Sequence, residues 1–141
     1  MQKFATAHWE GGLKDGKGQI STESGALKDQ PYGFNTRFED KAGSNPEELL
    51  GAAHAGCFSM ALSGQLAEAG LTADSIDTKA TVLLEKDGDG FVIPEVRLSV
   101  KAKVPGADKT AFDKAANAAK EGCPLSKVLN AKVVMSAELV S

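Results

Sequence analysis

The chain has few of the residues that build metal sites, disulfide scaffolds or nucleic-acid surfaces. Its 141 residues include only two cysteines and two histidines, and no C-x-x-C spacing is present, which argues against a metal site. No apolar run approaches the roughly 18 residues of a membrane span, and the N-terminus lacks the apolar core of a signal peptide. The 16 basic and 19 acidic residues form no basic block. We therefore expect a soluble, cytoplasmic protein that binds neither nucleic acid nor membrane.

The length predicts one domain, residues 1–141, because no repeat or linker interrupts the chain. A chain of this size buries a core without disulfides or metal, so the two cysteines are not needed as scaffolding. In a reducing compartment a permanent disulfide is not expected. Thiol chemistry is the leading hypothesis, although two buried and unreactive thiols fit the same counts.

The first half of the chain predicts a hairpin followed by a long helix. Residues 3–9 and 17–22 have the composition of two strands joined by a glycine-rich turn, and residues 23–43 have no regular pattern. Asn45, Pro46 and Glu48 then give the signature of a helix start, and Gly70 gives a stop, so a helix is predicted over 46–69. Its hydrophobic residues point in nearly all directions, which predicts a buried, central helix.

The second half predicts two further strands, two helices and a last strand. Residues 75–86 and 91–104 are β-branched and are linked by Asp87-Gly-Asp-Gly90, a hairpin signal. Helices are predicted over 108–121 and 124–129, and residues 131–140 alternate as a final strand. The resulting fold class is α+β, with the order β-β-α-β-β-α-α-β.

Cys57 needs a cation if it is to act as a nucleophile. It lies in the middle of the predicted helix, beyond the reach of the helix dipole, and with an ordinary pKa of about 8.5 only a few per cent is thiolate at neutral pH. Arg37 and Arg97 are the only arginines. Arg97 lies in a strand pattern, whereas Arg37 lies in an aromatic-rich segment, so Arg37 is the better candidate. The alternative for Arg37 is a solvated loop charge.

Glu47 and Glu48 are both explained by capping of the helix start, since acidic residues in the first turn interact favourably with the dipole. If Glu47 also pairs with Arg37, a distance constraint follows. Ten residues separate Glu47 from Cys57, about 15 Å along a straight helix. Either the helix is bent or broken, or the glutamate and arginine reach the thiol from a second subunit, which points to a homodimer with shared sites.

His54 and Cys123 each allow two interpretations. His54 lies one helical turn before Cys57, and we favour a packed or hydrogen-bonded core histidine over a catalytic base. Cys123 lies between Gly122 and Pro124, at the N-terminal end of a short helix, where a thiolate is favoured. A small hydrophobic residue at a helix junction fits that position equally well. Nothing in the spacing shows that Cys57 and Cys123 meet.

Five segments nevertheless resemble one known family: AHWEG (7–11), STESG (21–25), QPYGFNTRF (30–38), NPEELLGAAHAGCFSMAL (45–62) and GCPLS (122–126). They are similar to the osmotically inducible protein C (OsmC) family of bacterial thiol peroxidases, and to its OsmC branch rather than the organic hydroperoxide resistance (Ohr) branch. The resemblance covers nearly the whole chain. It implies an intertwined homodimer in which antiparallel sheets wrap around two long central helices.

The resemblance also implies an activity and residue roles. Cys57 corresponds to the peroxidatic thiol, Cys123 to the resolving thiol, Arg37 to the group that stabilises the thiolate, and Glu47 to the carboxylate that orients Arg37. The implied enzyme reduces organic hydroperoxides, and hydrogen peroxide more weakly, through a disulfide recycled by a lipoyl-type or thioredoxin-like dithiol. It uses no metal or organic cofactor and acts in oxidative or osmotic stress.

Apolar residues near these positions predict a substrate pocket lined by Phe34, Phe38 and Leu49. Phe58 and Met60 are assigned to the core instead. Two other functions remain open: a redox sensor that uses the same disulfide as a switch, and a dimer that binds an apolar ligand without turnover.

Overall fold

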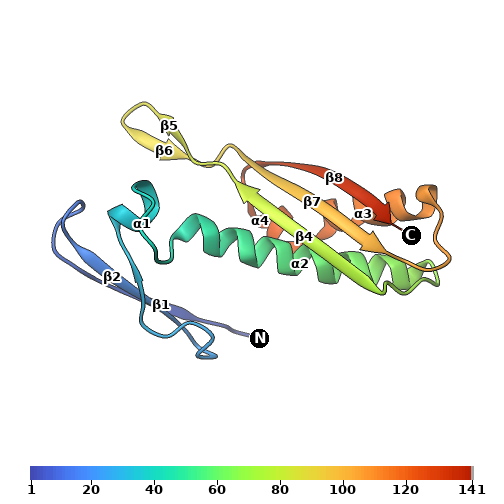
Figure 1. Ribbon diagram of the computed structural model, residues 1–141, viewed down its shortest axis with the longest axis horizontal. Helices are drawn as coiled ribbons and strands as arrows, with labels where there is room; N and C mark the ends of the chain where they lie inside the picture. The colour runs from blue at the N-terminus through green and yellow to red at the C-terminus, as the bar shows by residue number, and fades with distance from the viewer. Residues whose placement is uncertain (141) are drawn as a thin grey trace. The chain divides into compact units, whose positions relative to one another are not determined.

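The computed structural model describes residues 1–140, which fall into two compact units, residues 1–49 and residues from Leu50 onward. Figure 1 shows the helices and strands of both units, and the predicted α+β class is confirmed. The single domain over 1–141 stays a prediction. Among the described residues, no helix is both long enough and apolar enough to cross a bilayer.

The N-terminal unit contains the predicted hairpin and one more strand. Strands β1 (Ala5–Glu10), β2 (Lys17–Thr22) and β3 (Gln30–Tyr32) form an antiparallel sheet in that order. Gly18 is required in the middle of this sheet, because a Cβ at that position would lie 2.4 Å from the Tyr32 ring and 2.7 Å from the Trp9 ring. Because Gly18 has no Cβ, the Trp9 and Tyr32 rings can pack with their centroids 5.6 Å apart.

A short helix follows β3, so the prediction of an irregular segment over 23–43 is wrong at both β3 and this helix. Helix α1 (Phe34–Phe38) begins after Gly33, whose amide donates to the Thr36 hydroxyl oxygen at 2.8 Å. Phe34 and Phe38 lie one turn apart with ring centroids separated by 4.9 Å. Five residues are too few for a clear helical period, which is why the sequence pattern did not reveal α1.

Helix α2 (Pro46–Glu68) has the predicted start and end. Asn45 Oδ1 accepts a hydrogen bond from the Glu48 amide at 2.7 Å, as an N-cap does. At the other end Gly70 has a φ of 76°, and its amide bonds to the Ala67 carbonyl while the Leu71 amide bonds to the Leu66 carbonyl. This is the C-terminal motif that favours glycine, because a side chain is strained at positive φ.

The prediction that α2 is buried on nearly all sides is wrong for the single chain. One face is buried, at positions three or four residues apart: Gly51, His54, Phe58, Leu62 and Leu66. The other face carries small residues, with Met60 at 79% exposure. Phe58 is 0% exposed, so its assignment to the core is confirmed, whereas that of Met60 is wrong.

The C-terminal unit is built on a three-stranded sheet of β4 (Ser75–Val82), β7 (Glu95–Lys103) and β8 (Lys132–Val140). β4 and β7 pair in the antiparallel direction that was predicted, and β7 and β8 pair in parallel, so this sheet is mixed. The parallel pairing requires a crossover, which the helices between β7 and β8 provide.

The two predicted central strands are each shorter than expected. The ends of the two predicted strands next to the turn form a separate small hairpin instead, of β5 (Glu85–Asp87) and β6 (Gly90–Val92). Pro94 lies between β6 and β7, where its missing amide ends the ladder.

The crossover contains helices α3 (Lys109–Gly122) and α4 (Pro124–Val128). Alternate residues of β7 face the core and the residues between them are exposed. In Figure 1 the three strands run across α2 and α3, and the core joins these elements. Its fully buried members include Phe58, Leu62 and Leu66 from α2, Val96 and Val100 from β7, Phe112 and Ala116 from α3, and Cys123. Cys123 is therefore packed in the core beside α2.

Candidate active site

The fold brings Cys57 and Cys123 together, although 66 positions separate them in the chain. Their sulfur atoms lie 3.0 Å apart and share a hydrogen bond, and both cysteines are free. A covalent S–S bond is about 2.05 Å, so this is a reduced thiol pair in contact. Cys123 is fully buried and Cys57 is half-buried. The spacing left open whether the two cysteines meet, and the structure shows that they do.

Regular secondary structure fixes the backbone of each cysteine. Cys57 lies mid-helix in α2, beside the fully buried Phe58. Cys123 is both the C-cap residue of α3 and the N-cap residue of α4. Its amide donates to the Ala119 carbonyl at 2.9 Å, and its carbonyl accepts from the Lys127 amide at 3.1 Å. Pro124 starts α4 without an unsatisfied amide, so the backbone around Cys123 is fixed on both sides.

The surroundings of the two thiols favour different protonation states. Burial raises the pKa of the Cys57 thiol, and the hydrogen bond with Cys123 raises it further. Burial also opposes ionisation of Cys123, but hydrogen bonds from the Cys57 thiol, the Ser126 and Leu125 amides and the Ser126 hydroxyl together lower the pKa of Cys123 below its usual value. Negative charge is thus favoured on Cys123. Cys57 still needs the cation that its mid-helix position predicted.

His54 and Ser126 extend the thiol pair into a hydrogen-bonded chain. His54 Nε2 lies 2.8 Å from Ser126 Oγ, and the Ser126 hydroxyl in turn helps to lower the pKa of Cys123, the N-cap residue of the same short helix. His54 is 0% exposed and burial lowers its pKa, so it is neutral at neutral pH. The interpretation of His54 as a buried, hydrogen-bonded histidine is confirmed. Sequence reasoning missed Ser126, although its place three residues after Cys123, at the start of a short helix, was a usable signal.

Arg37 and Glu47 form a second pair, in the N-terminal unit. Arg37 Nε lies 2.9 Å and 3.2 Å from the two carboxylate oxygens of Glu47, and Nη2 lies 2.5 Å from Oε1. The Glu47 side chain is 13% exposed and that of Arg37 is 36% exposed. The Arg37 guanidinium also lies over the Phe38 ring, 5.2 Å from its centroid. The pair leaves part of the guanidinium free to contact another anion, which is the geometry that arginine offers and lysine does not.

A small apolar hollow of about 190 Å³ lies beside Arg37. Phe34 and Phe38 line it, whereas Leu49 is half-buried and does not line it, and the assignment of all three residues to a substrate pocket stays a prediction. The remaining lining residues are Trp9, Leu13, Tyr32, Gly33, Arg37 and Pro46. The hollow combines aromatic walls with one cation at its edge.

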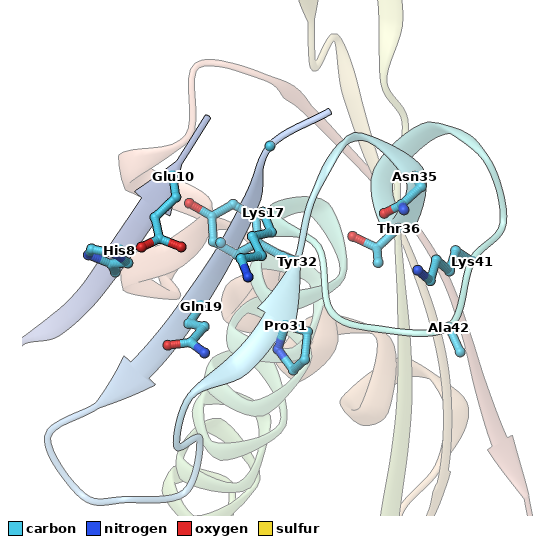
Figure 2. Close-up of a pocket in the computed structure, with 12 residues that line it drawn as sticks. His8, Glu10, Lys17, Gln19, Pro31, Tyr32, Asn35, Thr36, Lys41 and Ala42 are labelled. Carbon is cyan, nitrogen blue, oxygen red and sulfur yellow. Dashed lines mark ion pairs between the residues drawn. The ribbon is translucent and has the colours of Figure 1, made fainter. Parts of the chain in front are cut away.

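A larger cavity of about 450 Å³ lies over the sheet of the same unit and has a different character. Figure 2 shows His8, Glu10 and Lys17 on one side and Asn35, Thr36 and Lys41 on the other. His8 Nε2 and Glu10 Oε1 are 3.5 Å apart. This cavity is polar and contains neither cysteine, so size alone does not locate the thiol chemistry.

The chain is similar in sequence to known proteins over most of its length. The peroxiredoxin OsmC of Escherichia coli strain K12 is 55% identical over 141 residues, which cover 100% of this chain and 99% of that protein. The organic hydroperoxide resistance protein OhrB of Bacillus subtilis strain 168 is 32% identical over 123 residues, or 86% of this chain and 88% of that protein.

Solved structures show the same fold. The crystal structure of OhrB from Bacillus subtilis superposes with a TM-score of 0.68 at 29% identity, over 97% of this chain and 98% of that one. An OsmC-like protein from Mycoplasma pneumoniae has a TM-score of 0.76 at 16% identity, over 100% of this chain and 99% of that one, which supports the fold alone. The family model described as OsmC-like protein matches residues 38–138. The chain therefore belongs to the OsmC-like family, as the sequence segments around its two cysteines predicted.

Proposed function

We propose that this protein is a cysteine-based peroxidase that reduces organic hydroperoxides to alcohols, and hydrogen peroxide more weakly, in defence against oxidative or osmotic stress. The observation that carries the proposal is the contact between the sulfurs of Cys57 and Cys123, 3.0 Å apart, within reach of a disulfide bond. The names of the two relatives, a peroxiredoxin and an organic hydroperoxide resistance protein, support the same class of reaction.

The first step oxidises Cys57. Its thiolate attacks the outer oxygen of the hydroperoxide, an S–O bond forms as the O–O bond breaks, and the alkoxide leaves and takes up a proton to give the alcohol. Cys57 is left as a sulfenic acid. Arg37 stabilises both the thiolate and the charge that develops on the leaving oxygen, while Glu47 holds the guanidinium in place through the bidentate contact.

The second step forms the disulfide. The Cys123 sulfur attacks the Cys57 sulfenic acid, an S–S bond replaces the S–O bond, and water leaves. This step protects Cys57 from further oxidation. A lipoyl-type or thioredoxin-like dithiol then reduces the disulfide by exchange, which requires a reducing compartment such as the cytoplasm.

The site that we propose is shared between two subunits of a homodimer. Helix α2 continues without interruption from Pro46 to Glu68, so the ten positions between Glu47 and Cys57 correspond to about 15 Å along it. That distance is too long for a direct contact between Glu47 and Cys57 of one chain. The raised pKa of Cys57 supports this arrangement, in which a second subunit supplies the cation that stabilises the thiolate.

The organic part of the substrate fits the aromatic hollow beside Arg37. Phe34 and Phe38 present apolar surface next to the cation, which suits a peroxide that has a hydrophobic group at one end and a polar O–O bond at the other. Leu49 remains a proposed contact in the assembled site.

The test is non-reducing mass spectrometry of the reduced protein after addition of one equivalent of cumene hydroperoxide. We expect a rapid loss of two hydrogens, which peptide mapping assigns to a bond between Cys57 and Cys123. Cys57→Ser is the matched control and forms no such bond. Steady-state turnover with a dithiol then separates an enzyme from a redox sensor. Thiols that stay reduced in the wild-type protein would reject the peroxidase and favour the apolar-ligand-binding dimer.

A further inference from the structure

The hydrogen-bonded chain from Cys123 to His54 is not used by the two steps above. Ser126 lies in the first turn of α4, three residues after the N-cap Cys123, and its hydroxyl helps to lower the pKa of Cys123. His54 Nε2 ends the chain, 2.8 Å from Ser126 Oγ. Both end groups are 0% exposed. A core position of this kind has to satisfy its polar atoms within the protein, so the direction of each hydrogen bond is constrained.

The unpaired nitrogen of His54 fixes that direction. Among the described residues, His54 Nδ1 is buried and has no hydrogen-bond partner. A buried N–H without an acceptor is the rarer kind of unsatisfied group, so Nδ1 is the unprotonated nitrogen and Nε2 carries the hydrogen. Nε2–H then donates to Ser126 Oγ. Because that oxygen is occupied as an acceptor, the Ser126 hydroxyl hydrogen is directed at the Cys123 sulfur.

We propose that His54 is a positioning residue, which orients the Ser126 hydroxyl to donate to Cys123 and so holds Cys123 as the nucleophile that attacks the Cys57 sulfenic acid. This inference rests on the proposed peroxidase cycle and deepens its second step. The Cys123 thiolate gives its electron pair to the new S–S bond and is oxidised. The Cys57 sulfur is reduced as its S–O bond breaks, and the hydroxide that leaves takes a proton from solvent to become water.

The surroundings leave few other groups that could tune Cys123. Most residues of the sheet that face the core are apolar: Ile76, Ala80 and Val82 of β4, Val96 and Leu98 of β7, and Val133 and Met135 of β8. Thr78, on the same face of β4, is polar, and its hydroxyl lies 2.7 Å from that of Ser59 in α2. On the α3 side, Ala119 packs against the same core. Among the described residues of these elements, the titratable groups at this place are His54, Cys57 and Cys123. The backbone amides of Leu125 and Ser126 add to the Ser126 hydroxyl but do not depend on His54.

Two measurements on the full-length protein test the proposal. The first is thiolate absorbance against pH in a Cys57→Ser background, where Cys123 is the only thiol; it needs no peroxide. The second is the rate at which sulfenic acid converts to disulfide after one equivalent of cumene hydroperoxide, followed by dimedone trapping. His54→Leu and Ser126→Ala each remove one link. His54→Gln and Ser126→Thr restore an N–H and a hydroxyl, and His8→Leu, at a side chain that is 69% exposed, is the matched control.

We expect His54→Leu and Ser126→Ala to raise the pKa of Cys123 and to slow disulfide formation by about tenfold or more. Ser126→Ala removes a hydroxyl donor to the charged Cys123 sulfur, and His54→Leu leaves that hydroxyl without the partner that orients it. Sulfenic acid formation on Cys57 continues. His54→Gln and Ser126→Thr recover most of the lost rate, which mere filling of space at residue 54 would not explain. Should His54→Leu fail to fold, Ser126→Ala still tests the hydroxyl link to Cys123, and His54→Gln compared with the wild-type protein tests the His54 link: an impaired second step in His54→Gln would then count against the N–H donor.

Two results would overturn the inference. One is an unchanged Cys123 titration and an unchanged second step in both His54→Leu and Ser126→Ala. The other is a His54→Gln variant as impaired as His54→Leu, since an N–H donor would then not be what matters. A wild-type protein that forms no sulfenic acid would instead reject the peroxidase cycle, while the titration of Cys123 would still decide the role of His54.

Discussion

Phe58 and Met60 both follow Cys57 in α2, and their side chains have opposite environments. Phe58 is 0% exposed in the core between α2 and the sheet, whereas Met60 is 79% exposed on the face that carries small residues. If that outer face is the subunit interface of the proposed homodimer, Phe58 stabilises the folded subunit and Met60 stabilises the dimer. Phe58→Ala and Met60→Ala then form a matched pair that separates folding from dimerisation.

Phe58→Ala removes a large buried ring, so we expect the free energy of unfolding to fall by about 3–5 kcal/mol. For a chain of this size that corresponds to a melting temperature about 10–20 °C lower. Met60→Ala changes an exposed residue of the single chain, so its effect on the folding of one subunit stays within about 0.5 kcal/mol.

The effect of Met60→Ala on assembly is much larger. Burial of a methionine side chain contributes about 1.5–3 kcal/mol, and a twofold axis makes each substitution count twice per dimer. The dissociation constant therefore rises by about 100-fold or more. Sedimentation velocity over a range of protein concentrations measures this directly, with Phe58→Ala as the control at temperatures where it is folded.

A Met60→Ala dimer that dissociates no more readily than the wild-type dimer would contradict this prediction. In that case the outer face of α2 is not the subunit interface, and a shared site built on two such helices has to be abandoned. A wild-type protein that is monomeric at all concentrations would have the same meaning.

Three further predictions concern the polar groups. In Cys123→Ser we expect one oxidation by peroxide and then sulfenic acid that persists or over-oxidises in mass spectra; a lasting disulfide within the variant chain contradicts the assignment. In Arg37→Lys the planar contact to Glu47 is lost, so peroxide reacts more slowly and the pKa of Cys57 rises; an unchanged thiol titration would remove Arg37 from the site. Because burial lowers the folded pKa of His54 below 6.5, the unfolded chain binds the proton first, and stability falls as the pH drops below about 6.5, by up to about 1.4 kcal/mol per pH unit. Urea unfolding of His54→Gln should show a shallower decline over that range, and an equal decline would mean that His54 is not buried neutral.

Local signals in the sequence determined the two long helices, α2 and α3, and their ends. Asn45, Pro46 and Gly70 fix where α2 starts and stops, because capping depends on residues within one or two turns. Asp108 does the same for α3, whose Ala111 amide it caps at 2.7 Å. The family motifs around the cysteines also lie in short segments, so the sequence alone was enough to predict the family.

What the sequence could not provide depends on contacts between distant residues. The exposure of Met60 and the lining of the hollow beside Phe34 are properties of packing, which a periodic pattern does not reveal. The short elements β3 and α1 lack the length for a readable period. The parallel pairing of β8 with β7 is set by the crossover through α3 and α4.

In the candidate site, too, some features follow from local sequence and others only from contacts between distant residues. The residue types and the helix-end position of Cys123 could be read from the chain, and so could the need of Cys57 for a cation. Only the tertiary structure brings the two sulfurs to 3.0 Å and joins Ser126 and His54 to them. The physical reason is that a hydrogen-bonded network in a core depends on the packing of α2 against the α3–α4 junction, and that packing is decided by the whole sheet-and-helix core rather than by any one segment.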